Sequence, residues 1–165
     1  MIPEIKKILF ATDLSENSAY AFYYALHMAK RHEAKIVILH AVEPLPPLMI
    51  AFQDFVYKVA EDRWEEAVRT IKERLGEFSK KVDTRTGTSS RELVSNILIR
   101  MGHPVEEILK AVDEEGCDVI ILGSRGKGIV TETLLGSVSG SVLRRTRKPV
   151  FLVPLPSENS MMDLI

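Results

Sequence analysis

The residues most able to bind a ligand lie in the stretch GSRGKGIVTETLLGSVS, which follows the apolar run DVIIL. Gly123 and Gly126 come directly after that run, and Gly136 precedes two hydroxyl residues, Ser137 and Ser139, at the start of a helical pattern. Glycine lets main-chain N–H groups approach a ligand closely. The first amides of a helix lack partners within the helix, and the helix dipole favours an anion there. The spacing therefore indicates a phosphate-binding loop, in which the two hydroxyls could add donors.

Two better-known phosphate motifs do not match this stretch. A Walker P-loop needs Lys and then Ser or Thr after its last glycine, whereas Gly128 is followed by Ile129 and Val130. A GxGxxG dinucleotide motif has a different spacing. From these residues alone, the glycines could instead serve a tight turn and a helix cap. Both interpretations stay open on the local pattern.

Short apolar runs alternate with longer helical patterns along the chain. We predict strands at 6–12, 35–42, 96–101, 118–124 and 148–156, helices at 17–32, 50–79, 103–116 and 137–147, and turns at 80–92. This alternation predicts an α/β fold, an open parallel five-stranded sheet with helices on both faces. In such sheets ligands bind beyond the carboxyl ends of the strands. The ends of the first and fourth strands, Ala11–Asp13 and Gly123–Ser124, should therefore face one crevice.

The composition is that of one soluble globular domain. The 165 residues are 45% hydrophobic and 27% charged, and we expect a single domain over 1–154 with a flexible tail over 155–165. With 22 basic and 23 acidic side chains, no positive field would attract nucleic acid. No apolar run approaches the ~18 residues of a membrane span. We therefore predict a cytoplasmic protein that binds neither nucleic acid nor membrane, with its single cysteine, Cys117, as a buried hydrophobic residue.

Gly123, Gly126, Gly136 and Ser137 form the pattern G-2x-G-9x-G-[ST], and with it the chain resembles the universal stress protein family. The resemblance includes KKILFATDLSENS, IVILHAVEP, GHPVEEILKAVDEEGCDVIILGSRG and LLGSVSGSVLRRTRKPVFLV, whereas the long helix and residues 80–95 match loosely. The resemblance implies a Rossmann-like sheet in the strand order 3-2-1-4-5. It also implies bound ATP with Mg²⁺ or Mn²⁺, as in members that keep this motif.

The resemblance also assigns ligand contacts to positions of this sequence. The expected contacts are Ala11, Thr12 and Asp13 at the adenosine, the main chain of Ala41 at the adenine edge, Leu122 and Gly123 at the ribose and α-phosphate, and Arg125, Gly126, Gly136, Ser137, Val138 and Ser139 at the phosphates. Asp13 could contact the ribose or a divalent ion, or could cap the turn into the first helix. Arg125 and Lys127 could neutralise phosphate charge or be exposed loop cations.

Three further segments suggest a role in ligand binding, packing or assembly. The segment EPLPPLMIAF (43–52) could close over a nucleotide. Trp64 and the phenylalanines of the long helix should lie in the core or an interface. The last strand (Val150, Phe151, Leu152, Val153) lies at a sheet edge in the family's order, and pairing with a second copy would satisfy that edge. We therefore predict a homodimer.

These features favour a nucleotide-dependent regulatory binding module. The four histidines lack the spacing of a metal site, and no GxSxG nucleophile elbow occurs, so no catalytic residues are predicted. One alternative is a slow ATPase or phosphotransferase, although the loop offers no obvious residue to orient water. The other is a nucleotide-free scaffold, or a protein that prefers AMP or another adenosine compound.

Overall fold

The computed structural model describes residues 2–44, 53–86, 89–124 and 135–154, except for some side chains in the first two helices. The elements are β1 (Lys7–Ala11), α1 (Glu16–His32), β2 (Lys35–Val42), α2 (Gln53–Thr86), α3 (Ser90–Leu93), β3 (Val94–Met101), α4 (Pro104–Glu114), β4 (Val119–Gly123), α5 (Ser137–Arg145) and β5 (Val150–Val153).

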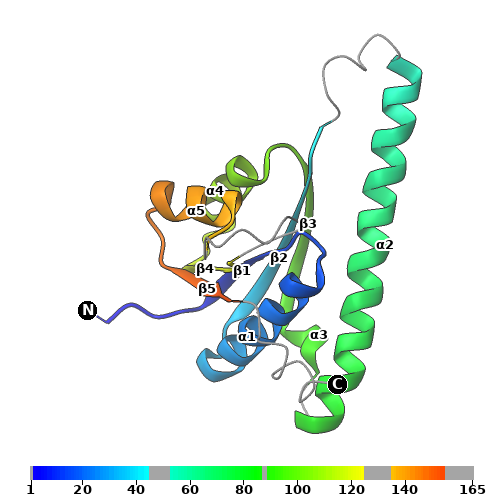
Figure 1. Cartoon of the computed structure of the whole chain (residues 1–165). Coiled ribbons are helices and arrows are strands. Elements are labelled where there is room, and N and C mark those ends of the chain that lie inside the picture. The colour runs from blue at the N-terminus through cyan, green and yellow to red at the C-terminus, as the bar shows by residue number, and fades with distance from the viewer. Residues whose placement is uncertain (1, 45–52, 87–88, 125–134, 155–165) are drawn as a thin grey trace.

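The strands form one parallel sheet in the order β3-β2-β1-β4-β5. Helix α1 covers one face, and α4 and α5 cover the other (Figure 1). The predicted single-domain α/β fold and the implied strand order are confirmed. From β1 the chain adds β2 and β3 on one side of the sheet and then β4 and β5 on the other. The strand order therefore reverses between β1 and β4. This is the switch point at which doubly wound proteins bind ligands.

The sheet is held by a separate apolar layer on each face. Successive strand residues point to opposite faces, so Ile8 and Phe10 pack toward α1, whereas Leu9 packs toward α4. Ile8, Leu9 and Ile120 are fully buried, and burying each such side chain contributes about 1.5–3 kcal/mol. Strands covered on both faces need continuous apolar residues, which explains why their sequence signal is strong. This double core fixes the strand ends that carry the site.

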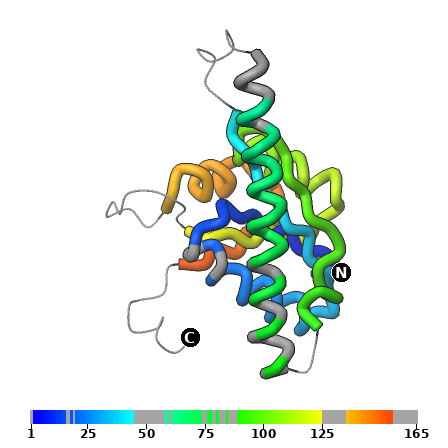
Figure 2. The backbone as a smooth tube through the Cα atoms, turned by 90° about the vertical axis from the view of Figure 1, so that its right-hand side faces the viewer, coloured from blue at the N-terminus to red at the C-terminus, as the bar shows by residue number. Residues whose placement is uncertain are grey.

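Helix α2 is longer than the sequence predicts, and it runs along the side of the sheet (Figure 2). It continues to Thr86 rather than ending near residue 79, and α3 adds a further turn, so the prediction of turns over 80–92 is wrong for most of that segment. Residues 80–86 contain neither glycine nor proline. The Thr84 hydroxyl donates to the carbonyl of Lys80 at 2.6 Å within the helix. The polar residues 80–86 therefore continue the helix, because none of them is a helix breaker.

The described side chains of α2 include two that pack inward. Ala67 and Ile71 are buried, whereas Trp64 is 46% exposed. Of the two predicted places for Trp64, the core is therefore excluded, and an interface stays a prediction. The side chains of Phe52, Phe55 and Phe78 lie outside the described residues, as does most of the 43–52 segment.

The edge strands also differ slightly from their predicted bounds. Strand β3 begins at Val94 rather than residue 96, and its residues alternate irregularly between exposed and half-buried. An edge strand pairs on one side only, so polar residues such as Ser95 and Asn96 are tolerated. Strand β5 is confined to Val150–Val153 and ends before Pro154, which cannot donate to the ladder.

Cys117 lies in the apolar layer beneath α4 and is fully buried. Burial raises the pKa of the Cys117 thiol to about 11, so the thiol stays protonated near neutral pH. This agrees with the predicted structural role. Among the described helices, none combines the length and the apolar character that crossing a membrane requires.

Candidate functional site

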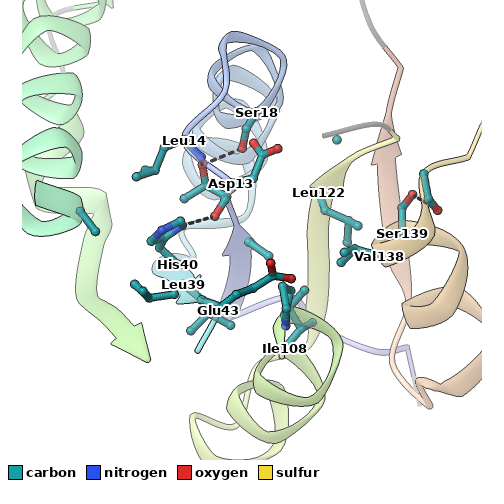
Figure 3. A pocket seen from close by; sticks show the side chains of 18 of the residues that line it. Asp13, Leu14, Ser18, Leu39, His40, Glu43, Ile108, Leu122, Val138 and Ser139 are labelled. Atoms are coloured by element: carbon teal, nitrogen blue, oxygen red, sulfur yellow. Dashed lines mark hydrogen bonds between the residues drawn. The ribbon is translucent and has the colours of Figure 1, made fainter. Parts of the chain in front are cut away.

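A pocket of about 770 Å³ opens at the carboxyl ends of β1, β2 and β4 (Figure 3). Every predicted contact within the described residues lines it, namely Ala11, Thr12, Asp13, Ala41, Leu122, Gly123, Gly136, Ser137, Val138 and Ser139. Arg125 and Gly126 lie outside the described residues. The structure thus brings together positions more than 100 residues apart in sequence, and the volume is in the usual range for small-molecule sites.

Thr12 organises the corner between β1 and α1. Its N–H donates to the carbonyl of Leu39 at 2.9 Å, which extends the pairing of β1 with β2. Its hydroxyl oxygen accepts hydrogen bonds from the N–H of Leu14 (3.0 Å) and the hydroxyl of Ser18 (2.7 Å). Leu14 has φ 65°, a left-handed conformation that non-glycine residues rarely adopt. The Thr12 hydroxyl therefore stabilises a strained turn at the edge of the pocket.

Asp13 follows within the same turn. Its Oδ1 accepts hydrogen bonds from the N–H (3.0 Å) and hydroxyl of Ser15. Ser15 in turn caps α1, because its hydroxyl oxygen accepts from the N–H of Ser18 at 3.2 Å. The turn-capping role for Asp13 is therefore confirmed. Asp13 also lines the pocket, so contact with a ribose or a cation stays a prediction.

His40 links the ends of β2 and β1. Its Nδ1 lies 2.8 Å from the carbonyl oxygen of Thr12. A carbonyl only accepts, so Nδ1 carries a proton and donates this hydrogen bond. This contact gives His40 a structural role, and the next residue, Ala41, lines the pocket.

The start of α5 is tied to the end of β4. The N–H of Gly136, the N-cap residue, donates to the carbonyl of Ser124 at 2.7 Å. The buried Ser139 hydroxyl donates to the same carbonyl at 2.8 Å, with a second contact to the Gly136 carbonyl at 3.2 Å. Its proton is therefore engaged within the protein, and a contact of Ser139 with a phosphate stays a prediction. Ser137 is exposed and keeps that possibility.

Three helices of the described chain begin at the pocket, and only α5 begins in a way suited to an anion. In α1, the N–H of Ser18 is already bonded to the Ser15 hydroxyl. Helix α4 starts with Pro104, which has no N–H, and its first turn carries Glu106 and Glu107. Helix α5 has no acidic residue in its first turn and no side-chain cap. Its first amides are the donors that an anion in this pocket would meet.

The charged side chains of the described lining are mainly acidic. They are the carboxylates of Asp13, Glu43 and Glu66 and the guanidinium of Arg63. Within the described residues, no group of three His, Cys, Asp or Glu side chains could hold a metal ion. A polyanion bound here would therefore rely on the α5 amides and on any cation that it brings with it.

The pocket has further walls that the sequence did not predict, from α2, α4 and additional residues at the ends of β1 and β2. The additional lining residues are Leu14, Ser18, Leu39, His40, Val42, Glu43, Arg63, Glu66, Ala67, Thr70, Pro104 and Ile108. A signal existed for Pro104, because it begins a helix directly after a strand, at the same edge of the sheet. For the α2 residues no local signal exists, since their place depends on how α2 packs.

The fold and the pocket define a doubly wound α/β protein with its site at the topological switch point. A model of the universal stress protein family matches residues 4–154, and the chain belongs to this family.

Its relatives agree with this assignment along most of the chain. The universal stress protein MJ0577 of Methanocaldococcus jannaschii is 31% identical over 156 residues, which cover 90% of this chain and 94% of the relative. A solved structure of the hypothetical protein MJ0577 has a TM-score of 0.76 at 27% identity and covers 94% of this chain and 100% of that one. A universal stress protein solved in complex with cAMP has a TM-score of 0.54 at 23% identity, covering 92% and 98%.

Proposed function

We propose that this universal stress protein binds ATP at the switch-point pocket and acts in the cytoplasm as a nucleotide-dependent regulatory module. The observation that carries the proposal is the start of α5, whose uncapped first turn lines the pocket without an acidic residue. Charge-assisted hydrogen bonds from such amides to phosphate oxygens are among the stronger ones in proteins. The phosphates would lie at Gly136, Ser137, Val138 and Ser139, next to the predicted contacts Arg125 and Gly126.

The nucleoside would extend from α5 across β1 toward β2. Leu122 and Gly123 end β4 beside the proposed phosphate position, and Ala41 lies near the end of β2 on the other side of β1. Neighbouring strands are about 4.8 Å apart, so the three strand ends span about 10 Å. In this arrangement Ala11, Thr12 and Asp13 would border the adenosine, and the Ala41 main chain would contact the base. Mg²⁺ or Mn²⁺ would enter with the phosphates.

Nucleotide analysis of the purified protein tests this proposal. We expect ATP in the supernatant after denaturation and chromatography, and tighter binding of added ATP than of AMP or cAMP in titrations. The comparison with cAMP is needed because a family member was solved with that ligand. If saturating ATP fails to bind, the nucleotide-free alternative replaces the proposal. Preference for AMP or cAMP would keep the site but change its ligand.

Weak ATP hydrolysis is the second candidate function. Phosphoryl transfer requires a positioned metal, charge clamps and an oriented nucleophile. The described lining offers carboxylates at Asp13, Glu43 and Glu66, but its acidic character opposes the charge that develops on the phosphates. We therefore expect turnover to be slow without a partner. A steady-state ATPase assay with and without Mg²⁺ measures it.

We also propose a homodimer formed through β5, the edge of the sheet. Phe151 is 39% exposed there, and its ring lies 5.9 Å from that of Tyr24 on α1. A hydrophobic edge strand is open to pairing, and an antiparallel two-fold contact would close it.

Sedimentation tests the dimer. We expect the wild-type protein to sediment as a dimer at micromolar concentration and Phe151→Lys to sediment as a monomer, because a charge would be buried at the two-fold contact. Leu143→Lys is the matched control, since Leu143 is 38% exposed but belongs to α5 and not to the edge strand. A stable wild-type monomer, or equal dissociation of both variants, would contradict this interface.

A further inference from the structure

The main chain at the end of β2 is held from two sides. The N–H of Gly102, just after β3, donates to the carbonyl of Val42 at 3.0 Å. Arg63 of α2 reaches across with its Nη1 and donates to the carbonyl of Glu43, also at 3.0 Å. Glu43 therefore leaves the sheet on a fixed backbone, and its side chain starts from a defined position.

Glu43 is an exposed residue at the mouth of the pocket, and its side chain points toward the pocket (Figure 3). In that view its carboxylate lies between Ile108 and the corner that carries Asp13. None of the ion pairs found among the described residues involves this carboxylate. Pre-organised polar groups that face a ligand site commonly set specificity.

The partner of this carboxylate must be a hydrogen-bond donor. An ionised carboxylate accepts hydrogen bonds and donates none, and it repels phosphate. Glu43 follows β2, whereas the phosphates are proposed at α5 on the far side of β1 and β4. Within a nucleotide that extends across the pocket, the group nearest to Glu43 therefore belongs to the base end.

We propose that Glu43 is a specificity-determining residue that selects purines with an exocyclic amino group at position 6 over 6-oxopurines. Adenine presents two N–H donors at that position, which a carboxylate can accept. Hypoxanthine and guanine present a carbonyl oxygen, which a carboxylate would repel. This inference rests on the proposed nucleotide function, and it adds a side-chain contact to the main-chain contact proposed at Ala41.

Binding of ATP and inosine triphosphate to the wild-type protein, Glu43→Gln and Glu43→Ala tests the inference. The two nucleotides share ribose and phosphates and differ at position 6 of the purine. Calorimetric titration should show wild-type preference for ATP, and that preference should fall about tenfold in both variants. In Glu43→Gln, the amide can donate to the 6-oxo group, so binding of inosine triphosphate should also strengthen.

Glu61→Gln is the matched control, because Glu61 is an exposed glutamate of α2 that does not line the pocket. It removes the same charge and should leave the ATP preference unchanged. Wild-type binding of ATP with a preference that does not change in the Glu43 variants would overturn the inference and leave the proposed function intact. If the wild-type protein binds neither nucleotide, both proposals fail.

Discussion

Replacing Gly136 by Val is expected to abolish ATP binding, with the affinity falling at least about 100-fold. Gly136 is the N-cap of α5, at the point where a phosphate would approach the first amides. A β-branched side chain there would fill the phosphate position. Losing two charge-assisted hydrogen bonds of about 1.5 kcal/mol each corresponds to roughly two orders of magnitude in affinity.

The Gly136→Val variant should still fold. Gly136 has φ −72° and ψ 167°, an extended conformation that valine also adopts. Valine is a poor N-cap, but Gly136 makes no side-chain cap, so the cost should stay near 1 kcal/mol. Calorimetric titration with ATP, with thermal unfolding to verify folding, measures both effects. Retained affinity would contradict the assignment of phosphates to α5.

Gly76→Val provides the matched control. Gly76 lies on α2 outside the pocket, and a Cβ added there would meet only the Arg91 guanidinium at an ordinary 3.8 Å. The same change of side chain should therefore leave ATP affinity at the wild-type level. A loss of affinity in both variants would indicate a general effect on the fold rather than a blocked phosphate position.

Thr12→Val is expected to destabilise the protein by about 2–3 kcal/mol and to weaken ATP binding about tenfold. Valine has nearly the shape of threonine but cannot accept the hydrogen bonds from the Leu14 N–H and the Ser18 hydroxyl. Ser18 is 4% exposed, so its hydroxyl would lose its acceptor in a buried position. An unsatisfied buried donor costs about 1–3 kcal/mol.

The loss of affinity would follow from the strained turn. Without the Thr12 acceptor, the left-handed conformation of Leu14 loses one of its restraints, and the Asp13 wall of the pocket becomes less ordered. Urea denaturation measures the stability, and ATP titration measures the affinity. Thr12→Ser keeps the hydroxyl and should retain most of both properties. Equal stability of Thr12→Val and the wild-type protein would show that these hydrogen bonds contribute little.

The fold and much of the site could be predicted because their signals are local. Strands covered on both faces require unbroken apolar runs, and β1, β2 and β4 have them. The spacing from Gly123 to Ser137 lies within one strand-loop-helix unit, so its meaning does not depend on distant residues. Alternating strands and helices then imply a parallel sheet whose strand ends share one edge.

The partners and the burial of individual side chains depend on their surroundings and could not be predicted in the same way. Ser139 looks like a phosphate donor in sequence, but its buried hydroxyl donates to the Ser124 carbonyl. Trp64 is large and apolar, which favours the core or an interface, but it is 46% exposed, whereas Ala67 and Ile71 of the same helix are buried. In both cases the deciding factor is which neighbour occupies the adjacent space, and a single sequence does not contain that information.

The sequence by itself determined the alternation of elements, the two strand ends that meet at the switch point and the glycine-rich entry to α5, because each follows from residue types within one local segment. Only the tertiary structure decided which helix completes the pocket. Helix α2 runs beside the end of β2, where Arg63 donates to the Glu43 carbonyl and the Glu43 side chain lines the pocket. These contacts join elements through packing, and packing depends on the shapes of surfaces that form only when the chain has folded.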